Sequence, residues 1–254
     1  MADRPSDAEL VAIYGDGYFA PSKYRDESTL RAESQRRLAL LGRYVQPGEG
    51  RRVLDAGCAI GDFVSHAKAD YEVFGVDLSA HAVDEARRRN PELGDRLRAG
   101  RLESLEFPDV AFDAICLWDV IEHLWDPVSV CRALMDRLRP GGVLLLSTPA
   151  ADAPIARIMG RFWAFMTPPE HLSFFTRRSL DFLARDLLRG SLLSCRRMGK
   201  RANVGFVLYK IRRIAPFLMP EAVVRSFRWP GLARLAVYVP TGDVQYAVVK
   251  KPPV

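Results

Sequence analysis

Cysteine is scarce in this sequence, and its four cysteines lie far apart. Cys58, Cys116, Cys131 and Cys195 form no CxxC pair and no Cys/His cluster, which argues against a zinc site or a disulfide scaffold. No apolar stretch near residue 1 resembles a signal peptide. We therefore expect a reduced, cytoplasmic setting.

Acidic residues are almost missing from one segment. Residues 196–228 contain nine Lys or Arg and only Glu221 as an acid, a net charge of +8 in a chain whose total is +6. A local basic patch suits an acidic partner such as a phosphorylated substrate, an anionic membrane surface or nucleic acid. A plain solvated face explains the same charges, and both interpretations stay open.

Apolar residues are plentiful, at 48% of 254 residues, enough to bury one substantial core. Apolar runs that read as strands alternate with segments of helical spacing, which is typical of a parallel sheet. A helix is predicted at 28–45, and others begin at Asp62, Ser79 and Pro127 and after Thr176. The predicted strands are 51–56, 72–77, 97–102, 112–118, 143–148, 191–197 and 244–251.

A glycine-punctuated turn follows the first predicted strand. Residues 53–63 read VLDAGCAIGDF, and the next strand ends at Asp77. Glycines in such a turn let a ligand lie directly beside the backbone, and a carboxylate about 20 residues later can accept ribose hydroxyls. Together these two features indicate a nucleoside site. Ala59 stands where the dinucleotide pattern GxGxxG has its second glycine, so we expect a nucleoside without a pyrophosphate.

Four motifs in order carry a family resemblance. Asp55, Gly57 and Gly61 match a DxGxGxG motif in which Ala59 replaces the middle glycine. The other three motifs are FDAICLWDVIEHLWDP at 112–127, LRPGGVLLLSTP at 138–149 and PPEHLSFFTRRSL at 168–180. The chain resembles the class I S-adenosylmethionine (SAM) dependent methyltransferases, in their UbiG-like small-molecule branch, over about two thirds of its length. The resemblance implies SAM as cofactor, S-adenosylhomocysteine as product, and a doubly wound, mostly parallel seven-stranded α/β sheet of Rossmann-like type whose last strand runs antiparallel.

We expect residues 1–254 to form a single methyltransferase domain. Residues 1–50 would be an N-terminal arm and helix, and 51–202 with 243–254 the core. The 203–242 segment is too long for a structureless loop, and an apolar stripe from Val204 to Leu218 predicts an amphipathic helix there. That insertion would cap the active site or lie on a surface, where its basic residues could contact lipid.

The resemblance also assigns cofactor contacts. The turn from Ala56 to Gly61 would offer backbone to the amino-acid end of SAM, Asp77 would accept the ribose hydroxyls, and Leu78 would pack on the adenine. Asp77 could instead cap the following helix, and Trp118 could equally be core. Cys58 is a small residue in a tight turn and is assigned no chemistry. The predicted cofactor-binding set is Asp55, Ala56, Gly57, Cys58, Gly61, Asp77, Leu78, Leu102, Glu103 and Trp118.

Two histidines lie in the matching motifs, and a neutral imidazole can take a hydroxyl proton near physiological pH. His171 is the preferred general base, because its loop is where substrate-facing residues belong, whereas His123 would anchor a helix start. Asp119, Glu122 and His123 partly match an ExxEH pattern on which some quinone-precursor methyltransferases hold a divalent metal. Salt bridging or capping is a simpler role for them, and we predict no metal.

The expected reaction is methyl transfer to an oxygen, or less favourably a nitrogen, of a small-molecule or lipid-linked acceptor that could be acidic or phosphorylated. The aromatic segment 161–175 could supply acceptor walls or core packing. The NPPY-type sequence of base-amine methyltransferases is missing, so no nucleic acid is expected. Alternatives are an RNA methyltransferase that docks through the basic insertion, and a catalytically silent SAM-binding partner protein. A nicotinamide oxidoreductase fits the motifs poorly.

Overall fold

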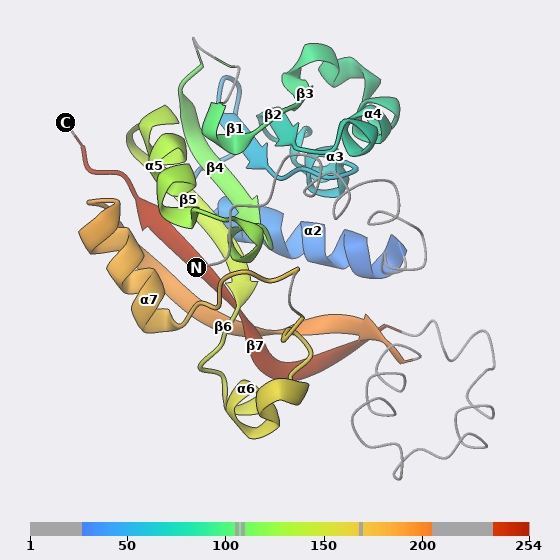
Figure 1. The fold of residues 1–254 in the computed structure, drawn as a ribbon. Coiled ribbons are helices and arrows are strands. Elements are labelled where there is room, and N and C mark those ends of the chain that lie inside the picture. Colours follow the sequence, from blue (N-terminus) through green and yellow to red (C-terminus); the bar gives the residue numbers. More distant parts are fainter. Residues whose placement is uncertain (1–26, 105–106, 108–109, 168–169, 205–235, 254) are drawn as a thin grey trace.

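Seven strands form one sheet in the order β3-β2-β1-β4-β5-β7-β6, with helices on both faces (Figure 1). The structure is a computed structural model that describes residues 27–104, 107, 110–167, 170–204 and 236–253. The first five strands pair in parallel, and β7 runs antiparallel to both of its neighbours. The predicted doubly wound, mostly parallel sheet is therefore confirmed. The strands are β1 (Arg52–Ala56), β2 (Glu72–Asp77), β3 (Leu97–Ala99), β4 (Phe112–Trp118), β5 (Leu138–Pro149), β6 (Ser191–Asn203) and β7 (Ala236–Lys250).

The helices divide between the two faces of the sheet. They are α2 (Glu27–Leu41), α3 (Asp62–Ala67), α4 (Ala80–Arg89), α5 (Pro127–Arg137), α6 (Pro154–Met159) and α7 (Arg177–Phe182), with 3₁₀ turns η1 (Pro91–Arg96), η2 (Leu102–Ser104), η3 (Ile121–His123) and η4 (Gly160–Phe162) and a π-helical turn η5 (Leu183–Leu187). Figure 1 shows α2, α3 and α4 on one side and α5 and α7 on the other.

Side chains that alternate along the strands build one apolar core on each face. In β4, Ile115 and Leu117 pack with α5 and α7, whereas Cys116 and Trp118 pack with α2, α3 and α4. All seven residues of β4 are buried. Strands covered on both faces have near-continuous apolar sequences, which is why the parallel sheet can be recognised in the sequence.

Two helix starts match their sequence signals. The Asp126 carboxylate accepts a hydrogen bond from the Ser129 N–H at 3.0 Å, with Pro127 as the first residue of α5. The Thr176 hydroxyl accepts one from the Ser179 N–H at 3.0 Å at the start of α7. Such caps satisfy backbone donors that a first helical turn leaves unpaired.

The last two strands are longer than the sequence predicts. β6 continues to Asn203 and β7 begins at Ala236, so Asn203 and residues 236–242 belong to strands and not to the insertion predicted at 203–242. The pairing register shifts between Met198 and Lys200, and such a bulge lets pairing continue past the Pro240–Gly242 stretch, which reads as a turn.

Three other element boundaries differ from the sequence prediction. α2 ends at Leu41 rather than at Val45, β3 stops at Ala99, and β5 begins at Leu138. The predicted arm up to residue 26 lies outside the described residues, as does the predicted helical stripe beyond Val204. In the part of the chain that the structure describes, no helix combines the length and apolar character needed to cross a membrane.

Candidate cofactor-binding site and acceptor side

The turn after β1 is held against the end of β2 by backbone hydrogen bonds. The N–H groups of Gly57 and Cys58 both donate to the Val76 carbonyl, at 2.7 and 3.0 Å. Gly57 has φ +89°, and a Cβ there would lie 2.4 Å from Val120 Cγ2. The position therefore requires glycine, both for its backbone conformation and for the close approach of the segment after β4.

Asp77 joins two elements through its carboxylate. One oxygen accepts the Ala59 N–H at 2.9 Å and the other accepts the Ser79 N–H at 2.9 Å. Burial raises the pKa of Asp77, and these two hydrogen bonds oppose that rise. A carboxylate has about four acceptor sites, so Asp77 keeps capacity for ribose hydroxyls while it supports the turn. Its ribose-binding role stays a prediction.

Asp55 is a buried acid at the end of β1. Its side chain is 2% exposed, and Oδ1 has no hydrogen-bond partner among the described residues. Burial raises the pKa of Asp55 to about 8, although the nearby Arg37 cation opposes the shift. A buried polar atom without a partner invites a ligand with a donor group.

The remaining predicted cofactor residues differ in exposure. Leu78 is 38% exposed beside Asp77, and Glu103 is exposed in η2. Leu102 and Trp118 are buried in the two cores, and the Trp118 ring contacts Phe63 at a centroid distance of 5.6 Å. Trp118 therefore packs as core, the alternative that the sequence left open. Their contacts with a cofactor stay predictions.

Cys58 is buried beside the turn. Burial, with Asp77 and Asp55 nearby, holds the pKa of its thiol well above the ordinary value. A thiol is not reactive in that state, in line with the interpretation of Cys58 as a structural residue.

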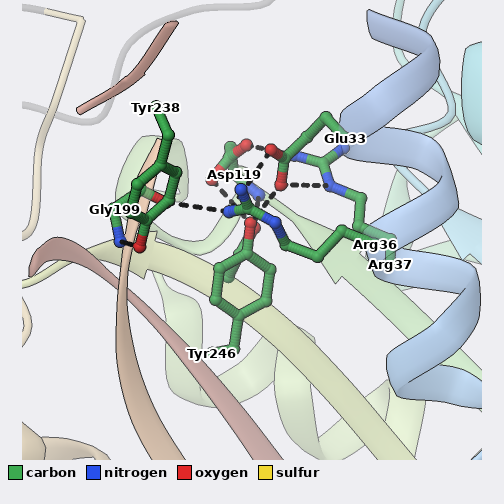
Figure 2. A network of polar contacts seen from close by, with 8 residues as sticks. Glu33, Arg36, Arg37, Asp119, Gly199, Tyr238 and Tyr246 are labelled. Carbon is green, nitrogen blue, oxygen red and sulfur yellow. Dashed lines mark hydrogen bonds and ion pairs between the residues drawn. The ribbon is translucent and has the colours of Figure 1, made fainter. Parts of the chain in front are cut away.

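Sequence reasoning missed a polar network between α2 and the carboxyl ends of the strands. Figure 2 shows Arg37 reaching from α2 to Asp119, which directly follows β4, where the Arg37 guanidinium donates to the carboxylate. The Tyr246 hydroxyl of β7 donates to Glu33 of α2. Arg36 donates to the Gly199 carbonyl of β6 at 2.8 Å. The network fixes α2 over the end of the sheet.

Arg37 places a partly buried cation beside the acids of this site. Burial lowers the pKa of Arg37, but Asp119 and the neighbouring anions outweigh this effect and raise the pKa above its ordinary value. Asp119 has φ +56° and also accepts the Ser147 hydroxyl at 2.8 Å. A cation at the carboxyl ends of β1 and β4 suits the carboxylate of an amino-acid moiety.

The predicted base His171 lies beside His123, with ring centroids 4.8 Å apart. The reason is local: the Glu122 carbonyl accepts the N–H groups of Leu172 and Ser173, at 2.8 and 3.0 Å, which holds the His171 loop on η3. His123 Nδ1 lies 2.7 Å from the Glu170 carbonyl, and His171 Nδ1 lies 2.6 Å from the Phe165 carbonyl. A carbonyl can only accept, so each Nδ1 carries the proton and each neutral ring has an Nε2 lone pair.

Glu122 completes a three-residue cluster with these histidines. The ligand atoms of Glu122, His123 and His171 lie within 4.8 Å of one another, a spacing that a divalent cation could bridge. The partial ExxEH match grouped Glu122 and His123 with Asp119, not with His171. The Asp119 carboxylate accepts hydrogen bonds from Arg37 and Ser147. Burial raises the pKa of Glu122 above its ordinary value, and the nearby Asp119 charge adds to this rise.

The cradle fits a SAM-like ligand on three observations. The turn at Gly57 has no room for a side chain, and Asp77 faces the turn from the next strand. Asp55 has a buried oxygen that no group in the described part of the chain hydrogen-bonds. Val120 contacts the Gly57 position and belongs to the segment that continues to His123. The cradle and the histidines are therefore adjacent.

Comparison with known proteins agrees with this geometry. A family model described as "Methyltransferase domain" matches residues 26–187. A ubiquinone biosynthesis O-methyltransferase from Xanthomonas axonopodis pv. citri is 29% identical over 206 residues, which cover 73% of this chain and 86% of that protein. A probable SAM-dependent methyltransferase from Mycolicibacterium smegmatis is 40% identical over 103 residues, and the match spans 39% of this chain and 38% of that protein.

Solved structures share the fold. The YcgJ protein from Bacillus subtilis superposes with a TM-score of 0.62 at 17% identity, covering 87% of this chain and all of that one. Magnesium protoporphyrin IX methyltransferase from Synechocystis, solved with S-adenosylhomocysteine, gives a TM-score of 0.56 at 16% identity, covering 95% and 92%. The chain thus belongs to the methyltransferase-domain family and is a class I, UbiG-like SAM-dependent methyltransferase.

Proposed function

We propose that the protein methylates an oxygen of a small-molecule or lipid-linked acceptor, and that His171 takes the proton from the acceptor hydroxyl. SAM, when bound, supplies a methyl group on a sulfonium that is already activated for displacement. The protein then has to align the acceptor, exclude water and remove one proton. Nitrogen is a weaker alternative that a 34% identical stretch of an Arabidopsis thaliana phosphoethanolamine N-methyltransferase favours.

The state of His171 supports a base role. Burial lowers the pKa of His171, and the hydrogen bond to the Phe165 carbonyl opposes this shift. The imidazole is therefore neutral at physiological pH, with its Nε2 lone pair free to accept a proton. His123, whose pKa burial also lowers, lies next to it and can position the same hydroxyl.

Apolar side chains around His171 support an acceptor with apolar surface. The His171 ring stacks on Phe165 at a centroid distance of 6.0 Å and meets Phe174 edge-on at 6.3 Å. Met166 and Leu172 are each 38% exposed nearby in the sequence. Apolar walls with a few polar groups are the usual composition of a small-molecule site. We expect no nucleic-acid acceptor.

The test is a screen of hydroxylated acceptors with methyl-labelled SAM, run on wild type and on His171→Gln. Loss of a general base should lower kcat by about 10²–10⁴-fold, while SAM affinity measured by calorimetry stays unchanged. His81→Gln, an exposed histidine of α4, is the control. The pKa of His171 lies below the usual 6.5. Wild-type turnover should therefore fall only when the pH drops below the lowered pKa of His171, where the imidazole becomes protonated.

Equal turnover in His171→Gln and wild type would remove the base role. SAM binding without methylation of any acceptor in the screen would favour the silent-partner alternative.

A further inference from the structure

Gln245 is an amide buried in the middle of the sheet. It lies in β7 opposite Thr148 of β5 and is 0% exposed. Figure 1 shows β7 in red between β5 and β6. The next residues on the same face of β7, Ala247 and Val249, belong to an apolar core. A buried amide costs stability unless it is hydrogen-bonded, so the partners of Gln245 indicate why the side chain is polar here.

Both polar atoms of the Gln245 amide have partners. Nε2 donates to the Phe175 carbonyl at 2.9 Å and to the Pro149 carbonyl at 3.3 Å. Oε1 accepts from the Cys195 thiol of β6, with sulfur and oxygen 3.8 Å apart. Because a carbonyl can only accept, the two carbonyls decide which end of the amide faces them.

The two carbonyls belong to segments that are far apart in function. Pro149 is the last residue of β5, and Phe175 directly precedes Thr176, the N-cap of α7. The Phe175 carbonyl also accepts the Ala151 N–H at 2.9 Å. Gln245 therefore fastens the chain before α7 to the carboxyl end of the sheet.

Residues 171–175, here called the His171 loop, are held at both ends. Near its start the Glu122 carbonyl accepts the N–H groups of Leu172 and Ser173, and at its end Gln245 holds Phe175. Each hydrogen bond fixes backbone and not the imidazole itself. A short loop that is fixed at two points has little freedom to move the ring that it carries.

We propose that Gln245 is a positioning residue that holds His171 where it can take the proton of the acceptor hydroxyl. It acts through the backbone of the His171 loop and not by contact with the reacting atoms. A misplacement of about 1 Å can lower a rate by about 10²-fold, so a buried hydrogen bond at the end of the loop can matter for turnover. The proposal rests on the proposed base role of His171.

The kinetic test replaces the amide by an apolar side chain of similar length. Gln245→Met removes both donors, and we expect kcat for the acceptor found in the screen to fall by about 10–100-fold. The described hydrogen bonds of Gln245 go to β5, β6 and the His171 loop. SAM affinity measured by calorimetry should therefore stay unchanged.

A double variant shows whether the loss passes through His171. Gln245→Met/His171→Gln should turn over as fast as His171→Gln alone, because a residue that acts only through the imidazole then has nothing left to position. A merely structural role would instead multiply the two losses. Multiplied losses would overturn the proposal.

Hydrogen exchange tests the placement of the loop without any acceptor. In Gln245→Met the amides of Leu172 and Ser173 should exchange about tenfold or more faster than in wild type, because the loop opens more readily when one of its ends is released. Mass spectrometry of peptides that cover residues 170–176 measures this change. Wild-type exchange in these peptides would mean that Gln245 does not hold the loop.

Two controls separate the loop from the rest of the core. Val249→Ala leaves a cavity two turns of the pleat further along the same face of β7 and should lower stability in urea unfolding. Cys195→Ala removes the partner of Oε1 and leaves both Nε2 donors in place. Both controls should keep wild-type kcat and wild-type exchange of the His171 loop.

A kcat loss in Val249→Ala as large as in Gln245→Met would overturn the proposal, because lost stability would then explain both. Failure of the proposed function looks different. If His171→Gln turned over like wild type while the loop amides of Gln245→Met exchanged faster, the base role would fail although Gln245 still anchors the loop.

Discussion

Gly57 shows how one residue sets the shape of the cofactor cradle. Its left-handed backbone turns the chain at the end of β1, and its missing side chain lets Val120 approach. Because Val120 leads into the segment with Glu122 and His123, the contact at Gly57 also sets how far the acceptor side lies from the cradle. A side chain at this position would push the two apart.

Gly57→Ala should therefore cost both stability and cofactor affinity. The methyl group would overlap Val120 Cγ2, and we expect a loss of about 1–3 kcal/mol in the free energy of unfolding with SAM affinity lowered about tenfold or more. Urea unfolding and calorimetry measure the two effects. Gly141→Ala is the control, because Gly141 also has a positive φ, of 75°, but the nearest atom to an added Cβ is Lys250 Cε at 3.9 Å.

The control should lose about 1 kcal/mol from backbone strain alone and bind SAM normally. If Gly57→Ala matched it in both measurements, the close approach of Val120 would not matter for binding.

At the scale of elements, α2 is held to the sheet by polar contacts as well as by apolar packing. Arg37 pairs with Asp119, Glu33 accepts from Tyr246, and Leu41 is fully buried against the sheet. The Arg37 side chain is 17% exposed and that of Asp119 is 43% exposed, so the pair is only partly screened by water.

We expect Arg37→Met and Asp119→Asn each to lower the free energy of unfolding by about 1–3 kcal/mol, because each removes one charge of a partly buried ion pair. The double variant should lose less than the sum of the two, and urea unfolding of all four proteins gives the coupling energy. The exposed pair Arg185 and Asp181 of α7 and η5, 2.7 Å apart, is the control and should couple by about 0.3–0.5 kcal/mol. Equal coupling in the two pairs would show that burial adds nothing to the Arg37 pair.

The sequence predicts the elements well where apolar pattern and caps decide them. β4 lies at the predicted residues, and α5 begins after Asp126 as predicted. The α2 network could not be predicted in the same way, because Glu33, Arg36 and Arg37 read as a solvated polar face. Burial of a charge depends on which element covers it, and that is a property of the assembled fold.

The candidate site, like the elements, could be predicted only in part from the sequence. The turn at 56–61 and Asp77 follow from strand ends and glycine spacing, and the structure brings them together. The pairing of His123 with His171 could not be predicted, because it depends on Leu172 and Ser173 donating to the Glu122 carbonyl across 50 or so residues of chain. The motifs that contain the two histidines were nevertheless the available signal.

For the whole molecule, buried acids make stability depend on pH. The pKa of Asp55 is raised to about 8, and that of Glu122 is raised from an ordinary 4.5. The folded state then holds protons that the unfolded state has released, so these groups lower the free energy of unfolding as the pH rises from about 4.5 toward 8. Below about 4.5 the two states bind these protons equally.

Glu122→Gln should therefore be more stable than wild type at pH 8, by about 1–3 kcal/mol, and the difference should vanish near pH 4. Thermal unfolding across this range, in EDTA so that no cation neutralises the acid, measures it. Glu85→Gln is the control, because hydrogen bonding to Arg89 lowers the pKa of this partly exposed acid and its removal should give no gain at high pH. A constant difference at all pH values would mean that Glu122 titrates normally in the folded protein.

The position of β7 between β5 and β6 has a consequence for synthesis on the ribosome. On the edge of β5 that faces away from β4, Leu144 to Thr148 pair with Gln245 to Val249, which are translated about 100 residues later. At about 5–20 residues per second, that edge of the nascent sheet stays open for several seconds and could pair with another chain. Slow translation of the segment between β6 and β7 should therefore increase the fraction of newly made protein that aggregates.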